Sequence, residues 1–373
     1  KRLVIMVSDG LRADSLYAWD GGQPRAPFLH HVAKSRGRWG VSHARPPTES
    51  RPGHVALLAG FYEDPSAITK GWQANPVEFD HLLNRSSNSW AMGSPDIVPL
   101  FTKGVPQARG ISYHPHLQDF GAGDLAQLDV WTFDQFENLF RRAKGRPPLG
   151  LPENSLASEL WQREYMRDPW TDAGEAQGEK LDEKLRQEKV VIFLHLLGAD
   201  SNGHAFRPSS PEYRHNVQVI DDGVRRVERV IEEFYDDDGQ TAYVFTADHG
   251  MSNKGSHGDG DPANTETPII VWGAGVANGE ILHTIQEGTE ENHGFAAAFK
   301  HAHLDGCKSR GVTPEDWHLR TSTRVDVDQA DIAALSTALV GLPCPLNSVG
   351  LLPHTYLQVP LPLLSGAILA NAG

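Results

Sequence analysis

Three apolar, strand-like runs of this chain end in an aspartate, and two of these ends also carry a histidine. The aspartates are Asp9, Asp200 and Asp248, and the histidines are His204, four residues after Asp200, and His249. Carboxylates and imidazoles that converge in a fold are ligands for zinc and for harder divalent cations. One aspartate after a strand is usually part of a turn, but three such ends together predict a shared metal site.

The elements that must position these residues alternate between strand-like and helix-like patterns. The clearest helix covers residues 211–234, where apolar side chains recur every three or four positions. Residues 41–54 resemble a loop, and a short helix is expected from Val55. The alternation predicts one three-layer α/β/α domain over residues 1–373 with a mainly parallel sheet, and residues 100–185 as an inserted excursion. In such sheets the carboxyl ends of the strands share one edge, where ligands bind.

Composition excludes some classes of partner. The chain has 34 basic and 48 acidic residues, a net charge of -14. This balance argues against nucleic acid or an anionic membrane surface as the main partner. No apolar run reaches the roughly 20 residues of a membrane span, yet both ends of the chain look cut, so we expect it to be part of a longer protein.

Two features bear on the compartment. Cys307 and Cys344 are the only cysteines. They are either two buried thiols or, in an oxidising compartment, one disulfide, and we predict the disulfide. Asn84-Arg85-Ser86 is a glycosylation sequon, which is weak evidence for a secretory lumen.

Several segments together resemble a known family. In chain order they follow the metal and nucleophile pattern of the alkaline phosphatase superfamily, and in detail they are similar to the GPI ethanolamine phosphate transferases, especially the members that act on the first mannose. The resemblance covers roughly residues 1–275. Its segments are residues 7–14 around Asp9, residues 45–54 around Thr48, residues 195–204, residues 246–252 and residues 254–260 around His257.

The resemblance implies a two-metal site, and the ligand types suit zinc. One ion would take Asp9, Thr48, Asp248 and His249, and the other would take Asp200, His204 and His257. His257 is the least secure ligand, with Asp259 and His293 as alternatives. Charge supports the pair of ions, because three converging carboxylates and one deprotonated hydroxyl balance two divalent cations.

The implied chemistry is phosphoryl transfer through a covalent intermediate. Thr48 would attack the phosphorus of a phosphodiester, since coordination to a dication stabilises its alkoxide. Thr48 also suits a helix N-cap, and Ser50 is the next candidate nucleophile. The implied donor is phosphatidylethanolamine and the acceptor a mannose hydroxyl of a GPI precursor. The parent protein would be anchored in the endoplasmic reticulum membrane by its own transmembrane segments, with this part in the lumen.

Weaker assignments concern the substrate. Ser94 and Asp96 follow a short strand and are candidates to line the substrate pocket, although a plain turn is the simpler interpretation. Asp259 and the nearby Asp261 are candidates to meet the ethanolamine ammonium, and His54 to orient the Thr48 segment. Two other functions stay open: a phosphodiesterase or phosphatase of the same superfamily, and a catalytically silent, lectin-like module.

Overall fold

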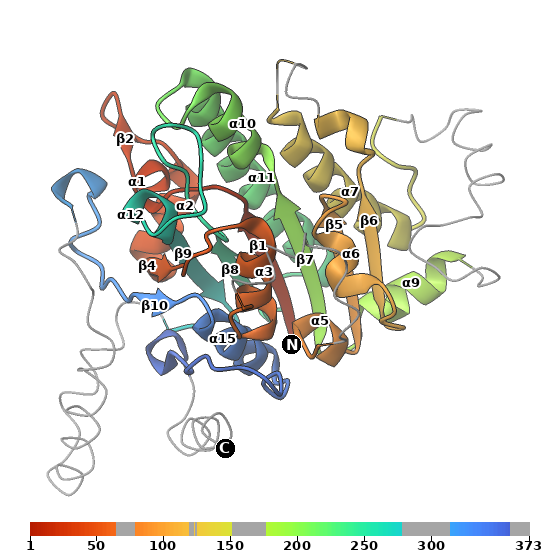
Figure 1. The fold of residues 1–373 in the computed structure, drawn as a ribbon. Helices are drawn as coiled ribbons and strands as arrows, with labels where there is room; N and C mark the ends of the chain where they lie inside the picture. The colour runs from red at the N-terminus through yellow and green to blue at the C-terminus, as the bar shows by residue number, and fades with distance from the viewer. Residues whose placement is uncertain (65–78, 119–122, 124, 151–176, 278–313, 359–373) are drawn as a thin grey trace, which may run out of the picture.

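A mixed eight-stranded sheet forms the centre of the computed structural model (Figure 1), which describes residues 1–64, 79–118, 123, 125–150, 177–277 and 314–358. The strand order is β10-β4-β9-β8-β1-β7-β5-β6. Only β9 runs antiparallel to its neighbours β4 and β8. The strands are β1 (Arg2–Ser8), β4 (Gly37–His43), β5 (Asn88–Gly93), β6 (Ala108–Ser112), β7 (Val190–Leu196), β8 (Thr241–Thr246), β9 (Glu266–Gly273) and β10 (Val327–Asp328); β2 (Trp19–Asp20) and β3 (Gln23–Pro24) form a separate hairpin.

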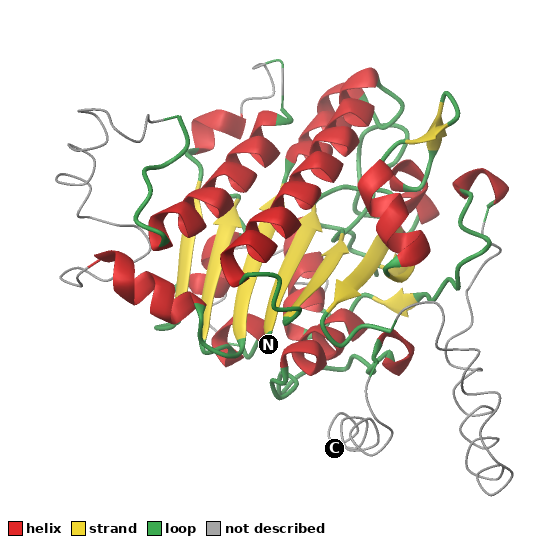
Figure 2. Cartoon of the chain, turned by 180° about the vertical axis from the view of Figure 1, so that it is seen from behind, coloured by secondary structure: helices red, strands yellow, loops and turns green. Residues whose placement is uncertain are grey.

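Helices cover both faces of the sheet, which confirms the three-layer α/β/α prediction. One face is covered by α1 (Ala13–Leu16), α2 (Pro27–Ser35), α7 (Gln127–Ala143), α9 (Gln177–Leu185), α10 (Gly198–Phe206) and α11 (Pro211–Tyr235), as the view from behind shows (Figure 2). The other is covered by α3 (Ser50–Ala59), α5 (Leu82–Arg85), α6 (Val98–Thr102) and α15 (Asp331–Val340). The short elements are α12 (Pro262–Thr265), η1 (Pro115–Gln118), η4 (Glu315–Trp317) and η5 (His354–Tyr356).

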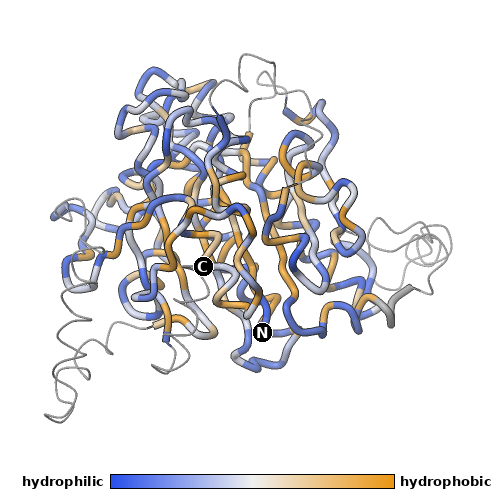
Figure 3. Tube along the Cα trace, turned by 60° about the horizontal axis from the view of Figure 1, so that its bottom comes forward, coloured by the Kyte–Doolittle hydropathy of each residue, from blue (hydrophilic) through white to orange (hydrophobic). Residues whose placement is uncertain are grey.

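The core has two halves because successive side chains of a strand point to opposite faces. In β1, Val4 and Met6 pack with the α7 and α11 layer, whereas Leu3, Ile5 and Val7 pack with the α3 and α15 layer. Figure 3 shows the hydrophobic segments gathered in the interior of the chain trace. Among the described residues, no helix is both long enough and apolar enough to cross a membrane.

The segment before Val55 differs from the prediction. Residues 41–54 were expected to be a loop, but β4 extends to His43 and α3 begins at Ser50. Pro52 and Gly53 suggested loop from sequence. Pro52 is tolerated because the first N–H groups of a helix have no intrahelical partner. Ser50 is therefore the first residue of a helix.

Part of the range predicted as an inserted excursion belongs to the main architecture. The strand β6 pairs in parallel with β5, and α7 packs against β7 and α11. Residues 151–176, in the same range, lie outside the described part of the chain. The boundaries of an excursion stay a prediction.

Candidate metal and catalytic centre

The register of three neighbouring strands brings the aspartate ends together. Val7 of β1 is opposite both His195 of β7 and Thr246 of β8. Asp9 and Asp248 therefore follow adjacent strands at the same edge, and both carboxylates are buried. The sequence-based expectation of one shared edge is confirmed for these residues.

Asp9 is the centre of the first group. Its Oδ1 lies 3.2 Å from His249 Nε2 and accepts a hydrogen bond from the Ser50 hydroxyl at 3.2 Å. Asp248 Oδ2 lies 3.6 Å from the same His249 Nε2. Asp248 Oδ1 accepts from the His249 N–H at 2.8 Å and from the Gly10 N–H at 3.3 Å. The backbone thus holds one oxygen of Asp248 and leaves the other facing His249.

A second group adjoins the first. His204 Nε2 and His257 Nε2 lie 3.3 Å and 3.5 Å from Asp200 Oδ1, and 3.0 Å from each other. The groups meet where the rings of His249 and His257 stack, with centroids 4.0 Å apart. The ligand-type atoms of Asp9, Asp200 and His249 all lie within 4.8 Å of one another. Residues from five separate sequence segments therefore share one centre.

The donor atoms fit metal ions. The Nδ1 atoms of His204, His249 and His257 face the backbone carbonyls of Gly255, Gly250 and Thr48 at 2.9–3.0 Å. A carbonyl only accepts, so each Nδ1 carries the proton and a neutral ring turns an unprotonated Nε2 to the centre. Asp200 Oδ1 and Asp248 Oδ2 are buried without a hydrogen-bond partner. Facing lone pairs and orphaned carboxylate oxygens are the arrangement that a bound cation satisfies.

Opposite charges shift the pKa values of this centre. Burial raises the pKa of Asp9, but His249 and His195 lower it further, so that it lies well below its ordinary value. Burial lowers the pKa of His249, but Asp248 and Asp9 raise it further, to well above its ordinary value. The Asp200 carboxylate, whose Oδ1 lies 3.3 Å from His204 Nε2, raises the pKa of His204. Protons and a metal ion therefore compete for these imidazoles.

The structure separates Thr48 from Ser50. The Thr48 hydroxyl donates to the carbonyl of Asp259 at 2.8 Å and accepts from the Gly258 N–H at 2.8 Å. The Ser50 hydroxyl lies on Asp9 and 3.4 Å from His249 Nε2. Thr48 also holds His257 through its carbonyl, 2.9 Å from His257 Nδ1. Thr48 thus joins its segment to the 257–259 loop, and Ser50 is the hydroxyl that faces the metal-type ligands.

His54 and His195 are buried beneath the centre. His54 Nδ1 lies 2.7 Å from the Ser50 carbonyl and 3.3 Å from Asp248 Oδ2, which agrees with a role in orienting this segment. His195 Nε2 lies 3.0 Å from Asp9 Oδ2. Burial lowers the pKa of His195. Sequence reasoning gave His195 no role, and its only signal was one histidine within a buried apolar strand.

The candidate substrate residues lie at the margins of the centre. Ser94 is buried, and its hydroxyl accepts from the Asp96 N–H at 3.1 Å, while Asp96 itself is exposed. The Asp259 carboxylate accepts from the Asp261 N–H at 3.0 Å and from Asn264 at 2.7 Å, so it braces its own loop. Substrate roles for Ser94, Asp96 and Asp259 stay predictions.

Two further predictions involve residues outside the described part of the chain. His293, an alternative to His257 as a ligand, lies in a range that the structure does not describe. Cys344 is half-buried, but its predicted partner Cys307 also lies outside that part of the chain. The disulfide therefore stays a prediction.

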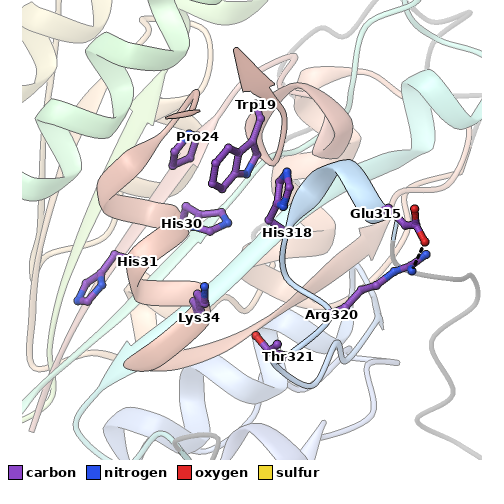
Figure 4. A pocket seen from close by; sticks show the side chains of 9 residues that line it. All are labelled: Trp19, Pro24, His30, His31, Lys34, Glu315, His318, Arg320 and Thr321. Atoms are coloured by element: carbon purple, nitrogen blue, oxygen red, sulfur yellow. Dashed lines mark hydrogen bonds and ion pairs between the residues drawn. The ribbon is translucent and has the colours of Figure 1, made fainter. Parts of the chain in front are cut away.

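A separate surface pocket shares no residue with this centre. Figure 4 shows its lining from the β2–β3 hairpin, α2 and the segment around η4, including Trp19, His30, Lys34 and His318. His30 is 3.2 Å from the Trp317 carbonyl, and the rings of Trp19 and His318 lie 4.0 Å apart. These side chains contact their own neighbours, so the pocket adds nothing to the metal-type ligand set.

Comparisons with known proteins identify chains that are similar to this one. Over 361 residues the chain is 44% identical to GPI ethanolamine phosphate transferase 1 of Homo sapiens, covering 96% of this chain and 33% of that protein. The Aspergillus oryzae protein of the same name is 45% identical over 386 residues, covering 100% of this chain and 33% of that protein. The chain thus spans about a third of the length of these relatives.

Structural and family comparisons give the fold and the family. The solved structure of the 2-O GAG sulfatase BT1596 matches 95% of this chain and 74% of that chain, with a TM-score of 0.51 and 12% identity, which shows a shared fold. The model of the type I phosphodiesterase / nucleotide pyrophosphatase family matches residues 3–325. The chain belongs to the type I phosphodiesterase / nucleotide pyrophosphatase family.

Proposed function

We propose that this chain is the catalytic domain of a metal-dependent phosphoethanolamine transferase. It would move phosphoethanolamine from phosphatidylethanolamine to a mannose hydroxyl of a GPI precursor, and we propose the first mannose as the acceptor. Identity of 44% over 96% of the chain to proteins named GPI ethanolamine phosphate transferase 1 supports this substrate class. The parent protein would act at the endoplasmic reticulum membrane, with its own transmembrane segments beside this domain in the lumen.

The observation that carries the proposal is the position of the Ser50 hydroxyl. It lies 3.2 Å from Asp9 Oδ1 and 3.4 Å from His249 Nε2, at the first residue of α3. The N-terminus of a helix favours negative charge, on an alkoxide or on a phosphoryl group. We therefore assign the nucleophile to Ser50 in place of Thr48, whose hydroxyl is engaged by the 258–259 backbone.

Two divalent cations, zinc from the ligand types, would be held by the two adjoining groups. Asp9, Ser50, Asp248 and His249 would hold one, and Asp200, His204 and His257 the other. When bound, the ions would lower the pKa of the hydroxyl and neutralise charge on the phosphoryl oxygens.

The protein residues then support two displacements. The Ser50 alkoxide, its proton released to solvent, attacks the phosphorus, the bond to the diacylglycerol oxygen breaks, and that oxygen takes up a proton from solvent. Phosphoethanolamine is now esterified to Ser50. A mannose hydroxyl attacks the same phosphorus and releases its proton to solvent, and the bond to Ser50 breaks, which frees the Ser50 alkoxide for the next cycle. Splitting the transfer into two displacements is the advantage of a covalent nucleophile.

The test uses the acceptor to separate transfer from hydrolysis. Protein with quantified metal is incubated with a short-chain phosphatidylethanolamine, with and without a mannose-containing GPI fragment. Phosphoethanolamine on the glycan, at the expense of free phosphoethanolamine, supports the transferase. Release of phosphoethanolamine at the same rate with and without the glycan would instead indicate a phosphodiesterase, and absence of bound metal would contradict the two-metal centre.

A further inference from the structure

His195 is fully buried and contacts the carboxylate of Asp9. It is the sixth residue of β7, and its ring is edge-on to His54 with centroids 4.7 Å apart. Its Nε2 lies 3.0 Å from Asp9 Oδ2, and its Nδ1 lies 3.3 Å from the backbone nitrogen of Ser94. Both ring nitrogens therefore have one defined partner.

The partners fix which nitrogen carries the proton. The backbone N–H of Ser94 can only donate, so His195 Nδ1 must accept and is unprotonated. In a neutral ring the proton is then on Nε2, which donates to Asp9 Oδ2. The backbone at the end of β5 thus selects the tautomer that presents a donor to the buried carboxylate.

The hydrogen bond from His195 gives the two carboxylate oxygens of Asp9 different roles. Oδ2 is engaged by His195, whereas Oδ1 faces Ser50 and His249 at 3.2 Å each. A carboxylate with one oxygen held in this way offers only the other to a metal, in a fixed direction. Donors behind ligating carboxylates commonly set their orientation.

The neighbouring strand β5 approaches His195 closely at a glycine. Gly93 has a φ of 143°, and a Cβ there would lie 2.7 Å from His195 Cβ and 2.4 Å from the His195 carbonyl oxygen. A side chain at position 93 would therefore push β5 away and break the Ser94–His195 hydrogen bond. The close approach of β5 to β7 is part of the same arrangement.

We infer that His195 is a positioning residue of the catalytic centre, which holds Asp9 as a one-oxygen ligand beside Ser50. The inference rests on the proposed function, because it requires Asp9 to bind a metal. In this arrangement the backbone N–H of Ser94 orients His195, a role that differs from the substrate-lining role expected from the sequence.

The experiment measures zinc affinity in the protein isolated with its metal, by competition with a chromophoric chelator. His195→Phe keeps a planar ring but removes both nitrogens. The expected result is a loss of about 10- to 100-fold in affinity for the ion bound by Asp9, with the Asp200-side ion little changed. His195→Gln, which retains a donor and an acceptor, should recover most of the affinity.

Leu194→Ala is the matched control. Leu194 is the preceding residue of β7, is fully buried and faces the opposite core layer, so its truncation destabilises the fold without touching Asp9. Equal losses of zinc in His195→Phe and Leu194→Ala would overturn the inference, as would unchanged affinity in His195→Phe when the unsubstituted protein binds two ions. An unsubstituted protein that binds no metal would instead overturn the proposed centre together with the inference.

Discussion

The Ser50 hydroxyl donates to Asp9 Oδ1 at 3.2 Å, across 41 residues of sequence. This contact joins the first residue of α3 to the end of β1, so the candidate nucleophile and a candidate metal ligand reach the centre from two different elements. Two residues earlier, Thr48 faces the 258–259 backbone instead. The two hydroxyls, only two residues apart in the sequence, therefore have different contacts in the centre.

Thr48 should behave as a positioning residue for His257. Thr48→Val keeps the side-chain shape but leaves the Gly258 N–H and the Asp259 carbonyl without their side-chain partner, and the loss of a hydrogen bond of this kind costs about 0.5–1.5 kcal/mol. We expect Thr48→Val to lower turnover and zinc content in part, and Thr48→Ser to retain both. Steady-state kinetics with metal analysis checks this, and complete loss of turnover in Thr48→Val with zinc intact would favour Thr48 as the nucleophile.

Removing a ligand from either group should remove metal. Asp248→Ala and His204→Ala each delete one donor, and the remaining carboxylates repel once the cation is lost. We expect each purified variant to contain about one zinc fewer per chain, with turnover near background, as plasma emission spectrometry and the transfer assay would show. Normal stoichiometry in either variant would contradict that ligand assignment.

The pH dependence of stability should reveal Asp129 of α7. Burial raises the pKa of Asp129 to about 7, although Gly198 and Asn216 donate to its oxygens. In the unfolded chain this pKa is about 3.9. The raised pKa contributes stability that is complete below about pH 4 and is lost as pH rises to about 7.

The comparison is with Asp129→Asn, in urea unfolding at several pH values. Asn216 Oδ1 already accepts a hydrogen bond from Asn202 at 3.0 Å, and the Asn216 NH2 group points to position 129. The NH2 group of an asparagine at position 129 would therefore face a second donor, which should destabilise the fold. The stability of the unsubstituted protein relative to this variant should decrease between about pH 4 and pH 7. A difference that is constant or increases over that range would show that Asp129 is ionised in the folded state. Asp222→Asn, at an exposed position of α11, serves as the control.

The close contact of α3 with Asp248 depends on Gly53. A Cβ at this position would lie 2.8 Å from Asp248 Cβ and 2.9 Å from the Asp248 carbonyl oxygen. Gly53→Ala should therefore destabilise the protein by about 1–3 kcal/mol through overpacking, despite the higher helix propensity of alanine, and should draw Ser50 away from Asp9. In Gly203→Ala of α10 the new methyl would lie 2.9 Å from Met251 Cε and Cγ, which are side-chain and not backbone atoms, so a smaller loss is expected. Equal stability of the two variants in chemical denaturation would contradict this.

Much of the architecture was predictable because it follows from periodicity. The apolar runs before Asp9, Asp200 and Asp248 identified the central strands β1, β7 and β8, and the stripe in residues 211–234 identified α11. The run before Asp200 was read too far, because β7 ends at Leu196 and Asp200 lies in α10. The start of α3 was missed, because Pro52 and Gly53 indicate a loop when only the local sequence is considered. Both are tolerated here because the N–H groups in the first turn of a helix have no intrahelical acceptor.

The arrangement of side chains within the centre was harder to predict from the sequence. Thr48 and Ser50 have the same chemistry and a spacing of two, so only the three-dimensional path of the segment decides which hydroxyl faces Asp9. His195 looks like one polar residue in a buried strand until the Ser94 N–H and the Asp9 carboxylate are placed on either side of its ring. Long-range contacts of this kind leave no local pattern.

The most direct test of the account is the site of the covalent intermediate. The protein with its metal is mixed with a short-chain phosphatidylethanolamine without acceptor, quenched in acid, digested and analysed by peptide mass spectrometry. We predict a phosphoethanolamine adduct on Ser50, absent in Ser50→Ala and still present in Thr48→Ala. An adduct on Thr48 that persists in Ser50→Ala would contradict the assignment of Ser50.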